Sequence, residues 1–181
     1  MLKKRSFLAK TVLFIAILAL VFLLATNLPA LQFNKISEEQ SLQTMRLLIE
    51  KYSLEKTFSP NQLTIEAYLN ELAVLNGKST GSAAKIIEAE QFSAQAFYYL
   101  NQAMQNSTQI NYTSFQCKSK ETVETISSLK IAQEKVTAAE KAVQSLSDTQ
   151  KKYLRENQSE MINNYSTQIT LLKKYFDEKC R

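Results

Sequence analysis

Histidine is absent from this chain of 181 residues, and cysteine occurs only twice. Without imidazole the chain lacks the commonest general base and the histidine partner of serine or cysteine nucleophiles. Structural zinc sites need about four ligands, which come mostly from cysteine and histidine. No glycine-rich phosphate loop is present either. We therefore expect no enzyme activity, no metal site and no cofactor.

Glycine and proline are scarce, with two of each, and tryptophan is absent. Tight turns between strands depend on glycine and proline, so a sheet protein of this length would need more of both. Alanine, leucine, glutamate, lysine and glutamine are abundant instead, and these residues favour helices. The composition predicts an all-α protein.

The positive charge of the chain is concentrated at its N-terminus. The formal net charge is +5, but Lys3, Lys4, Arg5 and Lys10 all precede the first apolar run. Without these four, 18 of the 22 basic residues remain against 17 acidic residues. A nucleic-acid-binding domain usually carries a dense basic face. We therefore expect no nucleic-acid partner.

The N-terminal apolar run has the length of a membrane span. No charged residue lies between Lys10 and Lys35, and as a helix Thr11–Leu31 would extend about 31 Å, close to the hydrocarbon thickness of a bilayer. The basic flank that precedes it should stay in the cytoplasm. We predict a cytoplasmic flank over residues 1–10 and a transmembrane signal anchor over residues 11–31. The remaining chain would then lie outside the cytoplasm, tethered to the cell membrane.

A cleaved signal peptide is the competing interpretation of the same run. Cleavage needs small residues at positions −3 and −1. Ala30 would place Leu28 at −3, and Ala25 would place Leu23 there. Neither site fits, so we favour an uncleaved anchor and keep a secreted helical protein as the alternative.

Helix starts and stops are marked in several places. Three segments match the capping-box pattern, beginning at Ser37, Ser59 and Ser147. The pair Asn76-Gly77 is typical of a helix end, and Ser82 is the expected cap of the helix that follows. We predict amphipathic helices and one polar loop over residues 33–116, with the loop at 106–116.

Apolar residues recur at helical spacing through residues 33–116. The third of the three stripes is rich in small residues, which lets a neighbouring helix approach closely. The stripes are Leu42, Met45, Ile49, Tyr52; Ile65, Tyr68, Leu72, Leu75; and Ile86, Ala89, Ser93, Ala96, Leu100, Ala103.

Residues 117–181 are predicted to form a coiled-coil-like antiparallel hairpin. Its first arm carries a heptad seam and its second arm resumes the apolar pattern after a turn at Ser147-Asp148. The seam residues are Leu129, Ala132, Val136, Ala139, Val143, Leu146, then Leu154, Met161, Tyr165, Leu172, Tyr175. The pattern leaves open whether the preceding helices pack on the hairpin or form a separate stalk. A four- to five-helix bundle is favoured, since amphipathic helices need a surface to pack against.

The two cysteines fit this hairpin. Cys117 lies 31 residues before Asp148 and Cys180 lies 32 residues after it. A fold at Asp148 therefore brings them together, and an even cysteine count in an exported chain favours a disulfide. We predict the pair Cys117–Cys180.

Four sequons make candidate N-glycosylation sites, at Asn106, Asn111, Asn157 and Asn164. The first two lie in the predicted polar loop, where a glycan is easily accommodated. The other two lie on one face of the last helix, where ordinary solvated asparagine is the stronger interpretation. Their use depends on a host that performs the modification.

The remaining charged residues are expected to lie on solvent-exposed surfaces. Glu88 and Glu90 lack the spacing that places two carboxylates together on a helix, so we expect a solvated face. Lys151, Lys152 and Arg155 are expected on the exposed first turns of the last helix. A contact with an acidic partner is the alternative interpretation of these three residues.

The sequence thus indicates a cellular location more clearly than an activity. We expect a structural or protein-interaction module that is held in the lipid bilayer through residues 11–31. Its partner would be another envelope protein or a second copy of the chain. The alternative is an extracytoplasmic domain that binds a ligand or acts as a sensor.

Overall fold

The computed structural model describes residues 35–54, 58 and 61–180. The chain divides into two units, residues 1–34 and residues 35–181. The predicted basic flank and membrane anchor both lie outside the described residues. Within residues 35–54, 58 and 61–180, no helix is long and apolar enough to cross a membrane.

The described part is all-helical, which confirms the predicted fold class at that level. It contains six α-helices and one short 3₁₀ helix, and no strand occurs among these residues. The helices are α2 Glu38–Lys51, α3 Gln62–Lys78, α4 Gly81–Thr108, η1 Tyr112–Ser114, α5 Lys120–Gln144, α6 Asp148–Lys151 and α7 Gln158–Lys179.

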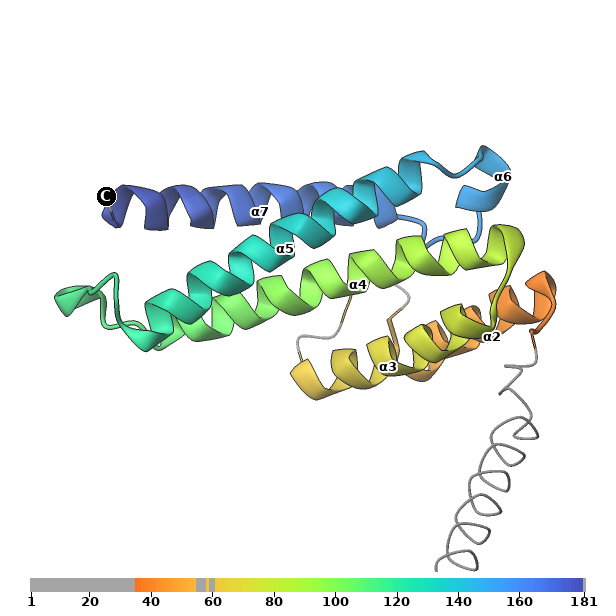
Figure 1. The fold of residues 1–181 in the computed structure, drawn as a ribbon, viewed down its shortest axis with the longest axis horizontal. Helices are drawn as coiled ribbons and strands as arrows, with labels where there is room; N and C mark the ends of the chain where they lie inside the picture. The colour runs from red at the N-terminus through yellow and green to blue at the C-terminus, as the bar shows by residue number, and fades with distance from the viewer. Residues whose placement is uncertain (1–34, 55–57, 59–60, 181) are drawn as a thin grey trace, which may run out of the picture. The chain divides into compact units, whose positions relative to one another are not determined.

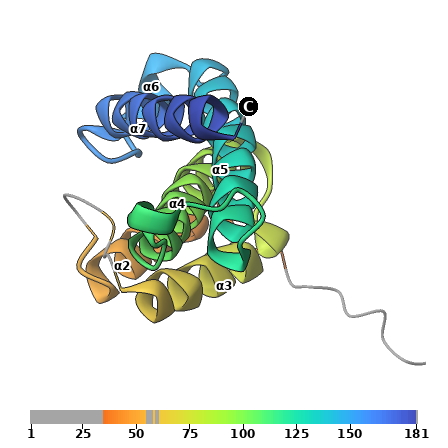
Figure 2. The ribbon, with the colours of Figure 1, turned by 90° about the vertical axis from the view of Figure 1, so that its left-hand side faces the viewer.

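Helix α4 is the centre of the bundle. It packs against each of α2, α3, α5, α6 and α7. Figures 1 and 2 show α2 and α3 on one side of α4, with α7 on the other side. The helices before the polar loop therefore pack on the later ones and do not form a separate stalk.

Small residues explain the central place of α4. All six members of its predicted stripe are buried, and Ala83 and Ala94 add further small buried positions around the helix. Small side chains let several neighbours approach one backbone closely, as a helix surrounded by others requires. The heptad seam of α5 is also buried throughout, as predicted.

The second arm of the predicted hairpin is not one continuous helix after the turn at Ser147-Asp148. Helix α6 is a single turn, and α7 begins only at Gln158. Arg155, in the connecting segment, turns into the interior, and the chain leaves the helical path to place it there. The buried face of α7 consequently includes Ile169 and Phe176, whereas Tyr175 from the predicted seam is exposed. Helices α5 and α7 still run in opposite directions (Figure 1).

Two of the predicted capping boxes are confirmed, at Ser37 and at Ser147. The predicted start of α3 at Ser59 was wrong, because Asn61 is the cap and accepts from two backbone N–H groups. Ser59 itself lies outside the described residues.

The connection from α3 to α4 also differs from the prediction. Gly77 lies inside α3, which ends at Lys78, and Ser82 lies inside α4. Helix α4 begins at Gly81, whose φ of +61° favours glycine. A Cβ atom at this position would also displace the carboxylate of Glu38 from its place beside the start of α4.

The predicted polar loop is shorter than residues 106–116. Helix α4 continues to Thr108, which places Asn106 in its last turn. Asn111 then caps the 3₁₀ helix. The polar side chains of this segment are used for local caps, and this is why polarity alone did not predict its helices.

Candidate functional site

A buried ion pair lies inside the bundle. Arg155 donates from Nε to Oε1 of Glu90 at 3.1 Å, and its Nη2 donates to the same oxygen. Each side chain is only 1% exposed. Both residues were predicted to lie on solvated faces, and both predictions were wrong, whereas Glu88, Lys151 and Lys152 are exposed as expected.

Arg155 joins three parts of the chain that are distant in sequence. Its Nη1 donates to the backbone carbonyl of Leu54, between α2 and α3. Its guanidinium carbon lies 4.0 Å from the centroid of the Phe58 ring, which is a cation–π distance. The segment before α7, helix α4 and the end of α2 therefore meet at one side chain.

Neutral polar residues complete this group, which we call the interior polar cluster: Tyr68, Glu90, Ser93, Arg155 and Gln158. The hydroxyl of Tyr68 donates to Glu90 Oε1 at 2.7 Å. Gln158 donates from Nε2 to the hydroxyl of Ser93 at 2.8 Å. All five residues are buried. The cluster therefore joins α3, α4, the α6–α7 connection and α7.

Two groups of the cluster, Tyr68 and Arg155, have raised pKa values. Burial, and next the Glu90 carboxylate, raise the pKa of Tyr68 well above its ordinary value, so this hydroxyl stays protonated. Burial alone lowers the pKa of Arg155, but the Glu90 carboxylate beside it outweighs burial, and the pKa is raised overall. Tyr68 and Arg155 therefore both keep their protons near neutral pH.

The cluster is suited to holding helices together. Within the described part of the chain, Glu90 Oε2 is a buried oxygen without a hydrogen-bond partner. Arg155 and Tyr68 both donate to the other carboxylate oxygen of Glu90, Oε1. Such a pair adds little net stability over an apolar core, but loss of one partner leaves a buried charge uncompensated. The arrangement consequently commits α4 and the α6–α7 connection to one register.

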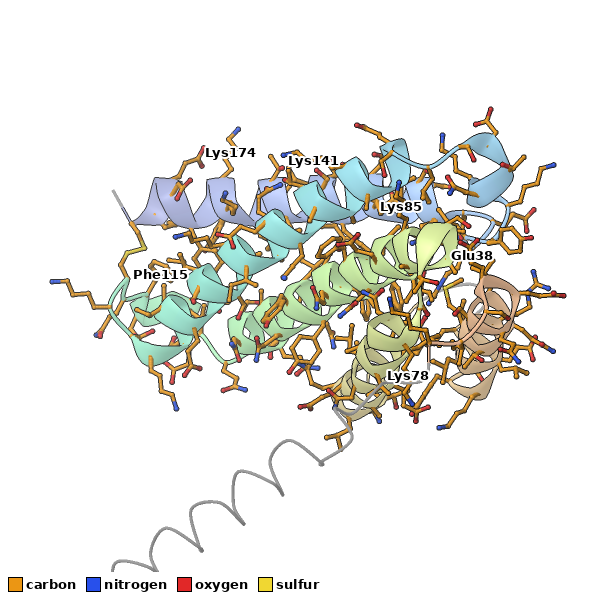
Figure 3. All side chains as sticks on the ribbon, turned by 45° about the vertical axis from the view of Figure 1, so that its right-hand side comes forward. Glu38, Lys78, Lys85, Phe115, Lys141 and Lys174 are labelled. Carbon is orange, nitrogen blue, oxygen red and sulfur yellow. A yellow bond between two sulfur atoms is a disulfide. The ribbon has the colours of Figure 1, made fainter. Side chains whose placement is uncertain are left out.

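Cys117 and Cys180 come together at one end of the bundle. They lie at disulfide distance, with their Cα atoms 5.5 Å apart, as the hairpin symmetry predicted. Figure 3 shows the pair beside Phe115, and it shows Glu38 toward the opposite end. Cys180 follows the last residue of α7 and donates its N–H to the Phe176 carbonyl at 2.9 Å.

An aromatic cluster surrounds this end, and sequence reasoning missed it. Phe115 lies 6.2 Å from Phe176 and 6.3 Å from Tyr112, measured between ring centroids. Tyr175 touches both Tyr112 and Phe176. The available signal was that Phe115 and Phe176 stand close to the two cysteines in sequence.

The four sequon asparagines occupy different environments. Asn106 is half-buried in α4, whereas Asn111, Asn157 and Asn164 are exposed. The side chain of Asn111 is already used, since its Oδ1 accepts from the N–H groups of Thr113 and Ser114. Glycosylation at all four positions stays a prediction.

Glu38 caps a helix to which it does not belong. Its Oε1 accepts the N–H of Ser82 at 3.0 Å, and its Oε2 accepts the Ser82 hydroxyl. Thr80, the N-cap residue of α4, makes no side-chain cap bond of its own. A carboxylate from α2 therefore satisfies a free N–H at the start of α4 and complements the helix dipole.

This cap should weaken in acid. The hydroxyl and then the backbone N–H of Ser82 lower the pKa of Glu38 below its ordinary 4.5. A lowered pKa in the folded state means that the contribution is present above the ordinary value and is lost as the pH falls through the lowered one. We expect amide hydrogen exchange at Ser82, corrected for intrinsic rates, to accelerate below that pH. Glu38→Ala should exchange faster at neutral pH and lose this dependence. Unchanged protection in Glu38→Ala would contradict the cap.

Among the surface grooves of the described part, two that border α2 lie away from the interior polar cluster. The larger, about 760 Å³, lies between α2, the start of α4 and the α6 region. It is lined by Glu38, Glu39, Leu42, Gln43, Arg46, Ser82, Ile86, Thr149, Gln150 and Tyr153. The smaller, about 440 Å³, lies between α2 and α3. Its lining is Ile36, Thr44, Leu48, Asn70, Glu71, Val74, Leu75 and Lys78.

In the part of the chain that the structure describes, no three cysteine or acidic residues lie close enough to hold a metal ion. Comparisons with protein-family models, with curated proteins and with solved structures find no match to this chain.

Proposed function

We propose that this protein is a membrane-anchored, extracytoplasmic helical module with a structural or protein-interaction role. Residues 11–31 would span the bilayer, and the bundle, ending in the antiparallel pair α5 and α7, would stand outside the cytoplasm. Its partner would be another envelope protein or a second copy of the chain.

The observation that carries this proposal is how the buried charges are used. Glu90 and Arg155 are the buried charged residues of the described part, and they bind each other. Neither lines either of the two grooves described above. Charged groups committed to holding helices together suit a rigid scaffold, whereas an enzyme needs reactive groups within reach of its substrate.

The cysteine pair supports the extracytoplasmic location. Disulfides persist in oxidising compartments and are rare in the cytosol. A pair at disulfide distance that closes the end of the bundle therefore favours export of residues 35–181. The positive flank before the apolar run independently favours the same orientation.

The intact mass of the protein purified from membranes tests these points together. We expect the full-length mass, with two alkyl groups added by a thiol reagent only after reduction. The cause is an uncleaved anchor combined with a closed Cys117–Cys180 bond. Hexose-scale additions would show that sequons are used.

Two other masses would contradict the proposal. A mass short by about 25 to 30 residues would mean signal cleavage and a secreted helical protein. Alkylation of both cysteines before reduction would remove the argument for an oxidising compartment.

Extraction with alkaline carbonate tests the anchor separately. Release of the full-length chain from membranes by alkaline carbonate would exclude a transmembrane anchor.

A ligand-binding or sensor domain is the second candidate function. The larger groove favours it, since its size suits a small molecule and Arg46, Gln43 and Tyr153 would provide polar contacts. A thermal-shift screen of the full chain in detergent would test it. A ligand that binds only the native state raises the unfolding temperature, and Arg46→Ala should abolish that rise. A screen without any stabilising compound would count against this function.

A further inference from the structure

Helices α2 and α3 carry three exposed large apolar side chains, and two buried leucines line the groove between these helices. We call this surface the α2–α3 face, made of Leu47 and Leu48 on α2 and Leu63, Val74 and Leu75 on α3. Leu48 and Leu75 line the floor of the smaller groove. Leu47 is 56% exposed, Leu63 75% and Val74 57%.

The exposed positions of α3 share one direction. Leu63, Asn70 and Val74 are separated by seven and four residues, which places them on one side of α3. Val74 also lines the groove with Leu48, so this side of α3 is continuous with α2. Scattered exposed leucines need no explanation, but an apolar face spanning two helices indicates an interaction surface.

Lysines mark one end of this face, whereas the exposed Glu50 and Glu66 lie one helical turn from Leu47 and Leu63. Among the residues that line the groove, Glu71 is the acidic one, and it is paired with Lys51. Lys78 lines the groove at one end, and its carbonyl accepts the N–H of Ile36 at 3.2 Å. Lys35, the residue before Ile36, is exposed. Two lysines therefore stand at the end where the described chain begins.

We propose that the α2–α3 face docks on the lipid surface that holds the anchor. This inference rests on the proposed function, because it needs residues 11–31 to be in the bilayer. Four residues lie between Leu31 and Ile36, and the five steps that join these two positions can span at most about 18 Å. The lysine end of the face therefore cannot lie far from the lipid headgroups.

The chemistry of the face matches a bilayer with anionic lipids. Leu47, Leu63 and Val74 would enter the boundary between headgroups and acyl chains, where interfacial helices bury their apolar sides. The aliphatic parts of the Lys35 and Lys78 side chains would lie along the bilayer surface, and their ammonium groups would contact lipid phosphates. Anchors emerging side by side would bring these lysines of two copies together, so a second copy fits this face less well.

Single tryptophan reporters can test this docking, because the natural chain has no tryptophan. Val74→Trp and Leu47→Trp place the reporter on the α2–α3 face. Val123→Trp on α5 and Leu171→Trp on α7 are matched controls, since these residues are 52% and 63% exposed. Each full-length variant is reconstituted into phosphatidylcholine vesicles with about one-third phosphatidylglycerol, with and without brominated acyl chains.

We expect brominated lipid to reduce the emission at positions 47 and 74 by about half, because interfacial side chains reach about 5–10 Å into the boundary. Emission at positions 123 and 171 should stay unchanged. Both leaflets carry bromine, so the orientation of the chain in the vesicle does not affect the result. Circular dichroism of each variant shows whether the bundle is folded. Because two positions of the face carry a reporter, the test still stands if one of the two variants does not fold.

Two outcomes would overturn the proposal. Equal emission with and without bromine at positions 47 and 74, together with free access of acrylamide, would show a solvated face. Protection from acrylamide that grows with the protein-to-lipid ratio, without bromine quenching, would show that a second copy covers it. Alkaline carbonate treatment of the same vesicles separates the two proposals. A chain that resists extraction but shows no quenching refutes only the docking, whereas an extracted chain refutes the anchor.

Discussion

Arg155→Met should lower the free energy of unfolding of the bundle by about 3–5 kcal/mol, the usual cost of breaking a buried ion pair. The substitution leaves the Glu90 carboxylate, 1% exposed, with the Tyr68 hydroxyl still donating to it but without its counter-charge. It also removes the contacts of Arg155 with the Leu54 carbonyl and the Phe58 ring. Thermal and urea unfolding of the full chain in detergent micelles, followed by circular dichroism, measures the loss.

A double-substitution cycle separates the charge from the packing. Glu90→Gln alone should also be strongly destabilising, because it leaves the Arg155 guanidinium buried without its counter-charge. The double variant Glu90→Gln with Arg155→Met should cost clearly less than the sum of the two single variants, since no buried charge remains. Purely additive losses would contradict the assigned role of the pair.

An exposed ion pair provides the matched control. Lys151 lies 3.6 Å from Asp148, and Asp148 is fully exposed. Solvent screens such a pair, so Lys151→Met should change stability by less than about 1 kcal/mol. A loss in Arg155→Met no larger than this would mean that the interior polar cluster is not essential to the fold.

Replacing both cysteines, Cys117→Ser with Cys180→Ser, should cost about 4 kcal/mol. The pair closes 62 intervening residues, and the estimate comes mainly from the chain freedom that the unfolded state regains without the bond. The aromatic cluster of Tyr112, Phe115 and Phe176 would also lose the tie between its two segments. The same unfolding measurements apply.

Reduction of the natural chain is the control for this variant. Wild-type protein treated with a reductant should unfold at the temperature of the double serine variant. The variant itself should not respond to the reductant, because no bond remains to be broken. Equal stability of wild type and variant before reduction would show that the cysteines contribute nothing as a bond.

Periodicity predicted much of the bundle correctly. The stripe of α4 from Ile86 to Ala103 and the seam of α5 from Leu129 to Leu146 are buried as expected. Such patterns are local, since residues three and four apart share a helix face whatever the helix packs against. The capping boxes at Ser37 and Ser147 depend on contacts within one turn and were predicted for the same reason.

Cysteine spacing also carried long-range information, which is unusual for a single sequence. The turn near Asp148 lies midway between Cys117 and Cys180, and two antiparallel segments of equal length must end side by side. The break before α7 did not disturb this pairing, because the open end of the hairpin is also packed by its aromatic residues. The prediction therefore depended on total length and was insensitive to helical continuity.

The amino-acid sequence by itself determined the all-helical class, the buried stripes and the meeting of the two cysteines, because each follows from local spacing or from chain length. Only the tertiary structure decided the burial of Arg155 and Glu90 and the capping of α4 by Glu38. The partners in these contacts stand 65 and 44 residues apart. Local sequence predicts that a charged side chain is exposed to solvent, because burying it costs free energy unless a counter-charge is close by. Here the counter-charge comes from a distant part of the chain, so only the folded structure shows it.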